Sequence, residues 1–297
     1  ELEGDQLKLI FEDGYNLYLR KDANLPEEGK EQTLIEKIIE IVRNDKNQVS
    51  SLDGMELILV PAGEFPMGCA RSHHGGRLCV SQELPLHTVY LDAYYIDKYE
   101  VTNAQYSLCV ESEACEVPQF ANSVNGSSWE YWVHPEFDSH PVVFVTWYDA
   151  QDYCKWAGRR LPTEAEWEKA ARGETIKAFP WGDEIPDCSF TNFDATVFSD
   201  DESVCVGGTS RVGSYPIDTS TYGVMDMGGN VSEWVNDWYS HYKETENLNP
   251  IGPVNGQEKS YRGGNWYTFY VQVAGRHSLT PDRYSGYLGF RCASSIP

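Results

Sequence analysis

The eight cysteines are the residues whose chemistry needs explaining first. A thiolate can bind a soft metal ion or act as a nucleophile, whereas two thiols can form a disulfide. No cysteine lies in a CxxC motif or in a Cys/His set with zinc spacing. Because the count is even, we interpret all eight as disulfide-bonded rather than catalytic. Disulfides indicate an exported protein, since a reducing cytosol keeps thiols free.

The seven histidines show no pattern typical of a metal centre. His73 and His74 are adjacent in a Gly-rich loop, and the others are scattered along the chain. The sequence has neither an HxxxH pair nor the spacing of two histidines and a carboxylate that a non-haem iron site uses. We interpret the histidines as solvent-facing loop residues.

Residues 260–278, SYRGGNWYTFYVQVAGRHS, are rich in aromatic side chains. Aromatic residues on a rigid scaffold supply a large contact area at low entropic cost, and Tyr and Trp add a polar tip. We therefore predict a ligand-binding face on this segment and the residues that follow it. The predicted ligand-binding residues are Trp266, Tyr267, Thr268, Phe269, Tyr270, Gln272, His277, Tyr284 and Tyr287.

A strand is the alternative for part of this segment. Alternation along residues 267–273 would bury Tyr267 and every second side chain after it. It would expose Thr268, Tyr270 and Gln272.

The charge of the chain limits the class of partner. The 297 residues include 23 basic and 46 acidic ones, a formal net charge of -23. This charge repels nucleic acid and anionic lipid and favours cations or basic partners, so we expect no nucleic-acid partner. No apolar run approaches the roughly 18 residues that span a bilayer. The chain starts at Glu1, not Met, which indicates a trimmed start from which a signal peptide or lipid anchor could have been removed.

Residues 1–52 predict a small N-terminal extension. Apolar residues alternate on both sides of Asp13 and Gly14, which predicts a β-hairpin with a two-residue loop over residues 7–20. Residues 33–44, TLIEKIIEIVRN, have the spacing of an amphipathic helix. Its apolar stripe would pack on the neighbouring domain or, alternatively, dock to another subunit.

Residues 53–297 predict one irregular α+β domain. Beyond residue 174 there is no long helical period, only short strands and loops rich in Gly, Pro, Asp and Trp. Before it, three helices are predicted by capping boxes, in which a Thr and a residue three positions later bond each other's backbone. The boxes are Thr102 with Gln105, Thr146 with Asp149, and Thr163 with Glu166.

Seven segments between residues 58 and 293 form an ordered set of motifs. They are ILVPAGEFPMG, HTVYLDAYYIDKYEVTNAQY, HPVVFVTWYDAQDYCKWAGRRLPTEAEWEKAARG, FPWGDE, YGVMDMGGNVSEWVNDWY, YRGGNW and LGFRCA. On these motifs the chain resembles the sulfatase-modifying-factor family, the formylglycine-generating enzyme and its relatives. The resemblance implies a large, loop-rich variant of the C-type lectin fold. The region from RGGNW to GFRC also resembles the variable region of proteins diversified by retroelements, which carry their ligand-facing residues there.

The resemblance also implies what catalysis would require. The family's enzymes oxidise a substrate cysteine with oxygen, using copper held by two cysteines that follow a GGS element; thiolates are what Cu(I) prefers. Here the element reads RGGNW, and no cysteine lies between Gly264 and Arg276. Ala171 replaces a further family cysteine. We therefore expect no copper and no formylglycine-forming activity.

Disulfide pairing follows partly from the resemblance. Cys154 and Cys292 match the family's structural disulfide, which would tie the central helix to the final strand. The remaining six cysteines pair most simply as neighbours in sequence: Cys69 with Cys79, Cys109 with Cys115, and Cys188 with Cys205.

YGVMDMGGNVSEW resembles the family's calcium loop. Asp226 and Glu233 would supply side-chain oxygens, and Gly229 and Val231 would supply backbone carbonyls. Such hard oxygen ligands are what Ca²⁺ prefers. A solvated acidic turn is the alternative.

FTNFDATVFSDDESV covers a second family calcium site. The matching ligands are the side chain of Asn192 and the carbonyl of Phe193. Asp200 or Asp201 could replace the downstream ligands, which depart from the family pattern. A solvated acidic turn is again the alternative.

Together these features predict a non-catalytic, calcium-stabilised, exported binding or accessory domain. It would recognise a protein, or alternatively a glycan, through the face that carries the active site in the enzymes. The N-terminal extension would act as an assembly arm. Two alternatives stay open: a structural subunit of a larger surface or membrane complex, and an oxidoreductase of the formylglycine-generating type with an unrecognised metal site.

Overall fold

The computed structural model describes residues 47–69, 79–119, 131–132, 134–197, 204–243 and 247–296, together with three N-terminal strands. These strands are β1 (Leu2–Glu3), β2 (Gln6–Ile10) and β3 (Asn16–Arg20), in the order β1-β2-β3. The predicted helix over residues 33–44 lies outside the described residues.

The predicted N-terminal hairpin is confirmed by the pairing of β2 with β3, whereas its predicted turn at Asp13 and Gly14 lies outside the described residues. β2 and β3 pair antiparallel with Leu9 opposite Leu17, which leaves residues 11–15 between the strands.

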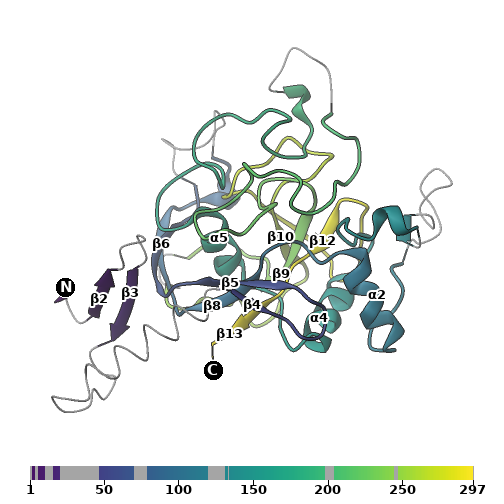
Figure 1. Cartoon of the computed structure of the whole chain (residues 1–297). Coiled ribbons are helices and arrows are strands. Elements are labelled where there is room, and N and C mark those ends of the chain that lie inside the picture. Colours follow the sequence, from purple (N-terminus) through teal and green to yellow (C-terminus); the bar gives the residue numbers. More distant parts are fainter. Residues whose placement is uncertain are drawn as a thin grey trace.

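The main domain contains two four-stranded sheets and one two-stranded sheet (Figure 1). The order β13-β8-β5-β4 joins β4 (Asn47–Val49), β5 (Glu56–Val60), β8 (Tyr94–Asp97) and β13 (Ala293–Ser295). The order β11-β10-β9-β12 joins β9 (Ser232–Trp238), β10 (Lys259–Arg262), β11 (Arg276–Leu279) and β12 (Leu288–Phe290). The third sheet pairs β6 (Gly63–Met67) with β7 (His87–Leu91).

All three predicted helices are present, and each begins at its predicted capping box. They are α2 (Asn103–Glu111), α4 (Trp147–Trp156) and α5 (Glu164–Arg172). Single 3₁₀ turns cover Ser81–Glu83, Pro135–Phe137 and Ala195–Val197. Between α5 and β9 the chain crosses the top of the molecule in Figure 1 mainly as loops, so the predicted irregular α+β architecture is confirmed. Within the described residues no helix is long and apolar enough to cross a membrane.

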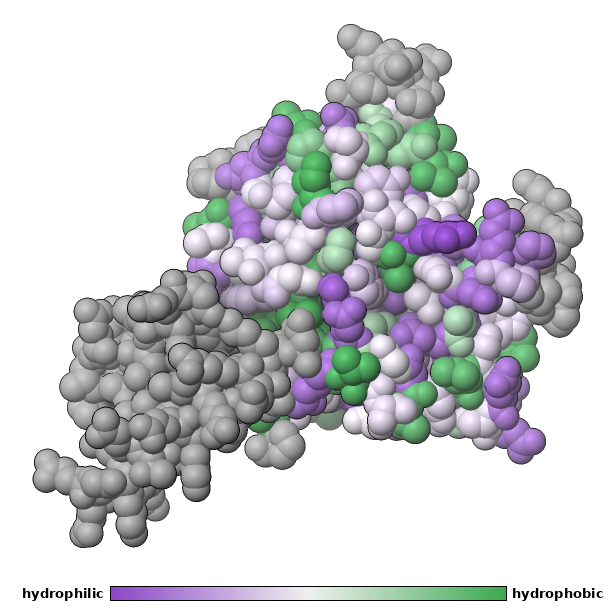
Figure 2. Space-filling view, in the orientation of Figure 1, coloured by the Kyte–Doolittle hydropathy of each residue, from purple (hydrophilic) through white to green (hydrophobic). Residues whose placement is uncertain are grey.

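β9 separates two apolar cores. Its Trp234 belongs to the core that includes Tyr153 of α4, and the next residue, Val235, belongs to the core that includes Trp167 of α5. This follows from the alternation of side chains along a strand. The face of the molecule in Figure 2 mixes polar and apolar residues over its described part, without one extended apolar patch.

α5 is buried along its whole length, including its charged residues. Glu164 accepts from Arg276 at 2.6 Å and from Arg262 at 3.1 Å. Arg262 also pairs with Glu168, which pairs with Arg172 at 2.8 Å. We call these five residues the α5 ion ladder. Opposite charges alternate along it, so each buried charge has a counter-charge, without which burial would cost several kcal/mol.

Replacing Arg262 by Ala should destabilise the protein strongly, because the change leaves Glu164 and Glu168 undercompensated inside the core. Breaking a buried pair in this way costs about 3 to 5 kcal/mol. Urea unfolding would measure the loss. Lys155→Ala is the matched control: its pair with Asp152 is exposed, and such pairs contribute about 1 kcal/mol or less. Equal losses in the two variants would contradict the importance of the ladder.

The eight cysteines form four disulfides in the predicted pairing: Cys69–Cys79, Cys109–Cys115, Cys154–Cys292 and Cys188–Cys205. The pair Cys154–Cys292 joins α4 to the link between β12 and β13 across 138 residues of sequence. It therefore holds two distant parts of the chain against one core.

Removing that disulfide by replacing both Cys154 and Cys292 with Ala should lower the free energy of unfolding by about 5 kcal/mol in the chain-entropy model. The matched change at Cys109 and Cys115, which are 6 residues apart, should cost only about 2 kcal/mol, because the loop released in the unfolded chain is short. Denaturant unfolding of both double variants tests the ranking, and a reversed order would refute it.

Candidate functional site

The predicted ligand-binding residues lie on the turns between β10 and β11, on β11 itself and on the turns between β11 and β12. Tyr267 is 66 % exposed, and Trp266, Phe269 and Tyr270 are half-buried beside it. The sequence prediction that aromatic side chains reach the surface here is therefore consistent with the fold.

The strand alternative for residues 267–273 is wrong. These residues form turns, closed for example by the N–H of Thr268 donating to the carbonyl of Asn265 at 3.1 Å. As a result Tyr267 is exposed and Gln272 is buried, the reverse of the alternation, although Val271 and Val273 are buried as it predicted. Turn geometry, not a pleat, sets the direction of these side chains.

The exposed Tyr267 is part of a group of three aromatic residues. Its ring is nearly parallel to that of Tyr287, with centroids 6.3 Å apart, and meets the ring of Trp266 edge-on at 5.6 Å. The indole N–H of Trp266 donates to the carbonyl of Gly286 at 3.1 Å. This bond fixes the group to the turn that precedes β12.

A second aromatic group continues the surface. Ring centroids lie 4.5 Å apart for Phe269 and Tyr270, and 6.1 Å apart for Tyr270 and His277. Tyr261, which the sequence analysis missed, stacks on His277 at 5.2 Å and lies directly opposite it in the β10–β11 register. Burial lowers the pKa of His277, and so does Arg262 beyond it, so the ring is held neutral.

We call the two groups together the aromatic face: Tyr261, Trp266, Tyr267, Phe269, Tyr270, His277 and Tyr287. Tyr284 is half-buried in the turn after β11. Two other predicted residues are not available for a ligand in the same way. The hydroxyl of Thr268 accepts the N–H of Tyr270, and Gln272 is buried.

The predicted calcium loop is a tight turn that leads into β9. Asp226 and Asn230 have left-handed backbone, with φ of 60° and 65°, which Asp and Asn tolerate better than most residues. Asp226 is 3 % exposed, and one of its oxygens accepts the N–H of Gly213 at 2.6 Å. A Cβ at Gly229 would lie 2.4 Å from the hydroxyl of Thr191, so this position requires glycine.

The carboxylate of Glu233, a predicted calcium ligand, is already engaged. Both of its oxygens accept from the guanidinium of Arg291 at 2.7 Å. The indole N–H of Trp167 also donates to it at 2.7 Å. Val231, another predicted ligand, is buried just before this strand.

A buried carboxylate that the sequence analysis missed lies beside the loop. Glu100 follows β8, is fully buried, and has no hydrogen-bond donor to either oxygen among the described residues. Burial raises the pKa of Glu100 well above its usual range, and the neighbouring Asp226 raises it further. The sequence does not identify Glu100 as part of this site, because only the fold brings it near the loop.

Negative charge is in excess around this loop. Burial raises the pKa of Asp226 to about 6 and that of Asp218 to about 7. Arg291 is the cation that opposes these shifts in the described part of the chain, and it is already paired with Glu233. Orphaned carboxylate oxygens and uncompensated charge are what a hard divalent cation would satisfy. The residues present therefore fit a calcium site.

At the second predicted calcium site, Asn192 is buried and its Oδ1 accepts no hydrogen bond from the residues that the structure describes. The carbonyl of Phe193 instead accepts the N–H of Cys205 at 3.2 Å. Asp200 and Asp201 lie outside the described residues. Within the described residues, the side-chain oxygen of Asn192 is therefore available to an ion, whereas the carbonyl of Phe193 already accepts a hydrogen bond.

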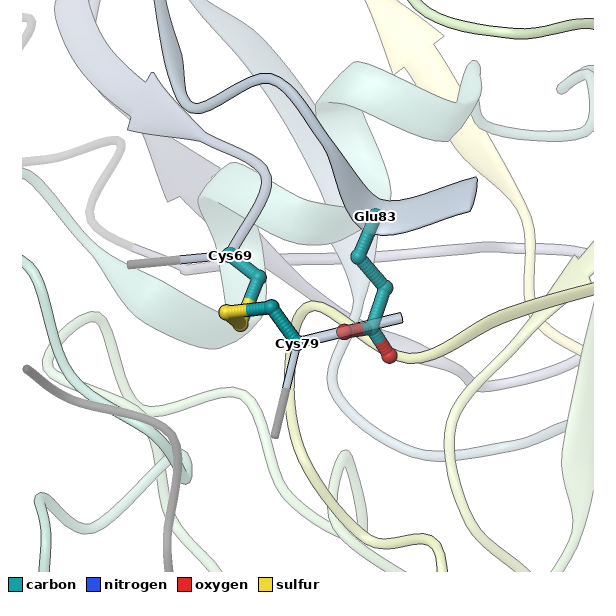
Figure 3. Close-up of side chains that lie close together, drawn as sticks. All are labelled: Cys69, Cys79 and Glu83. Carbon is teal, nitrogen blue, oxygen red and sulfur yellow. A yellow bond between two sulfur atoms is a disulfide. The ribbon is translucent and has the colours of Figure 1, made fainter. Parts of the chain in front are cut away.

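Among the described residues, Cys69, Cys79 and Glu83 have potential metal-ligating atoms close together. Figure 3 shows that the two sulfur atoms are joined in a disulfide, with the carboxylate of Glu83 beside them. A disulfide offers no thiolate, and Glu83 accepts the N–H of Val80 at 3.1 Å. We therefore interpret this group as structural.

Comparison with known proteins agrees with this fold and these motifs. Residues 43–296 match the family model of the sulfatase-modifying factor enzyme 1-like domain. The chain is 33 % identical over 287 residues to the formylglycine-generating enzyme of Bos taurus, covering 80 % of this chain and 74 % of that protein. It is also 33 % identical over 310 residues to the serine/threonine-protein kinase pkn1 of Chlamydia pneumoniae, covering 99 % of this chain but 45 % of the kinase.

The kinase match covers nearly the whole chain, so it includes the N-terminal extension. Among solved structures, Treponema denticola variable protein 1 superposes with a TM-score of 0.64 at 23 % identity, covering 84 % of this chain and 98 % of that one. At that identity the likeness shows the fold alone, which is the predicted loop-rich C-type-lectin-like fold. On the family match and on its 33 % identity to the bovine enzyme, the chain belongs to the sulfatase-modifying factor enzyme 1-like family.

Proposed function

We propose that this chain is a non-catalytic, exported binding domain that recognises a protein partner through the aromatic face and is stabilised by Ca²⁺. The observation that carries the proposal is the exposed Tyr267, which stacks beside Tyr287 and meets Trp266 edge-on, on turns that hydrogen bonds hold in place. Buried anchors at protein interfaces are enriched in Trp and Tyr, and fixed rings lose little entropy when they bind.

The cysteines support the absence of cysteine-dependent oxidation. All eight are paired in disulfides, so none is left as the thiolate that copper requires. The segment between Gly264 and Arg276, where the enzymes carry their copper ligands, instead supplies the aromatic face and buried Val271 and Val273. Four disulfides also favour an exported protein.

The relatives support a role as one part of a larger protein or complex. The chain spans less than half of the length of the three chlamydial kinases it matches. In those kinases a similar domain is therefore joined to further polypeptide, as expected for an accessory or binding module. A structural subunit of a larger complex would use the same scaffold, with its contacts away from the aromatic face.

Calcium would compensate the negative charge beside β9. Asp226 would supply a side-chain oxygen, and Gly229 and Val231 would supply carbonyls, as predicted from the sequence. When bound, the ion supplies positive charge to buried carboxylates, and its role in this proposal is stability.

Tyr267→Ser should weaken partner binding without unfolding the protein. Tyr267 is a surface residue, and substitutions at such sites usually change stability by about 0.5 kcal/mol or less. Peptide ligands would be selected from a display library against the natural protein. Their affinity for the variant, measured by calorimetry, should be at least tenfold weaker than for the natural protein. Tyr148→Ser, at a 50 % exposed tyrosine of α4, is the control and should bind normally. Unchanged affinity in Tyr267→Ser would contradict the proposal.

The enzyme alternative has its own test. The purified protein, loaded with Cu(I) and mixed with a cysteine-containing peptide, should consume no oxygen above the rate of the peptide alone. Mass spectrometry should find no aldehyde on the peptide. Oxygen uptake together with an aldehyde product would overturn the non-catalytic proposal, and loss of that activity on metal chelation would then point to an unrecognised metal site.

A further inference from the structure

The backbone segments around Glu100 and Asp226 are held side by side. The N–H of Met225 donates to the carbonyl of Lys98 at 2.9 Å. Arg291 reaches both segments, since it donates to the carbonyl of Lys98 at 3.1 Å and to that of Met225 at 2.9 Å. The turn between β8 and α2 and the loop before β9, over a hundred residues apart in sequence, therefore meet at one place.

At this meeting point the two carboxylates differ in their protein contacts. Asp226 accepts the N–H of Gly213, and Glu100 lies within hydrogen-bonding reach of Asp226. No other residue in the described part of the chain donates a hydrogen bond to Glu100, although it is completely buried. A buried ionised carboxylate without donors costs several kcal/mol, so the fold must supply either a proton or a cation here.

Glu233 cannot easily take the place of Glu100 as an ion ligand. Its oxygens already accept from Arg291 and Trp167, and moving it would leave the buried Arg291 without its partner. Asp218 is also satisfied, because it accepts from the hydroxyl of Thr191 at 2.6 Å and from the N–H of Gly228 at 3.0 Å. Of these buried acids, Glu100 is the one with oxygens to spare.

We propose that Glu100 is a calcium ligand of this domain, acting with Asp226 in place of Glu233, so that the ion links the turn before α2 to the loop before β9. The available donors are carboxylate and carbonyl oxygens, without nitrogen or sulfur, which suits Ca²⁺ better than a transition metal. The inference rests on the calcium part of the proposed function. Its alternative is a proton shared between Glu100 and Asp226.

The test compares Glu100→Gln with Asp218→Asn. Both remove one negative charge from the same buried cluster, but Asp218 has its own donors, so Asp218→Asn controls for charge alone. Calcium would be added to protein stripped with EGTA, and affinity measured by calorimetry. Glu100→Gln should bind calcium at least tenfold more weakly than the natural protein, while Asp218→Asn should stay within about threefold.

Hydrogen exchange gives a readout that does not depend on either variant folding well. In the natural protein, calcium should slow exchange in residues 99–103 as well as in residues 225–231, because the ion would hold both segments. Protection limited to residues 225–231, full affinity in Glu100→Gln, or an equal loss in Asp218→Asn would each overturn the inference while leaving calcium binding intact. A natural protein that binds no calcium would refute both the inference and the calcium part of the proposed function, and would favour the shared proton.

Discussion

The α5 ion ladder is the interaction on which the rest of the domain depends. α5 lies wholly inside the molecule although five of its nine residues are charged. Such a helix can be buried only if every charge is matched. Arg160, which precedes α5, pairs with Glu166, while Arg262 of β10 and Arg276 of β11 pair with the other two glutamates. The ladder therefore sets the distance and register between the helix and this sheet. Hydrogen bonds to backbone from Lys169 complete the match, at 2.7 Å to Pro61 and 2.9 Å to Gly63.

Local signals were sufficient to predict much of the scaffold. The three capping boxes placed the helices, because an N-cap is decided by residues within one turn of it. The sequence could not place Glu100 or Tyr261, since the role of each depends on a partner brought near by the fold. The sequence also did not predict the turns over residues 263–275. Apolar residues alternate there, but no strand forms.

The same limit applies to the predicted calcium ligands. Asp226 and Gly229 lie in one short turn, and the motif identifies that turn from sequence. Whether the carboxylate of Glu233 is free is decided by Arg291, which comes from the link after β12. A motif records residue types and spacing, whereas the partner of each carboxylate is set by segments far away in the chain.

β10 and β11 carry both the ladder and part of the aromatic face. Arg262 lies opposite Arg276, and the next pair along, Tyr261 and His277, points to the other side of the sheet. Side chains on that other side can change without touching a ladder residue, so recognition can diversify by substitution. A one-residue insertion or deletion in either strand would reverse the direction of its side chains. It would turn Arg262 or Arg276 toward the binding partner and an aromatic ring toward Glu164. Insertions and deletions that this surface tolerates should therefore be confined to the turns between the two strands.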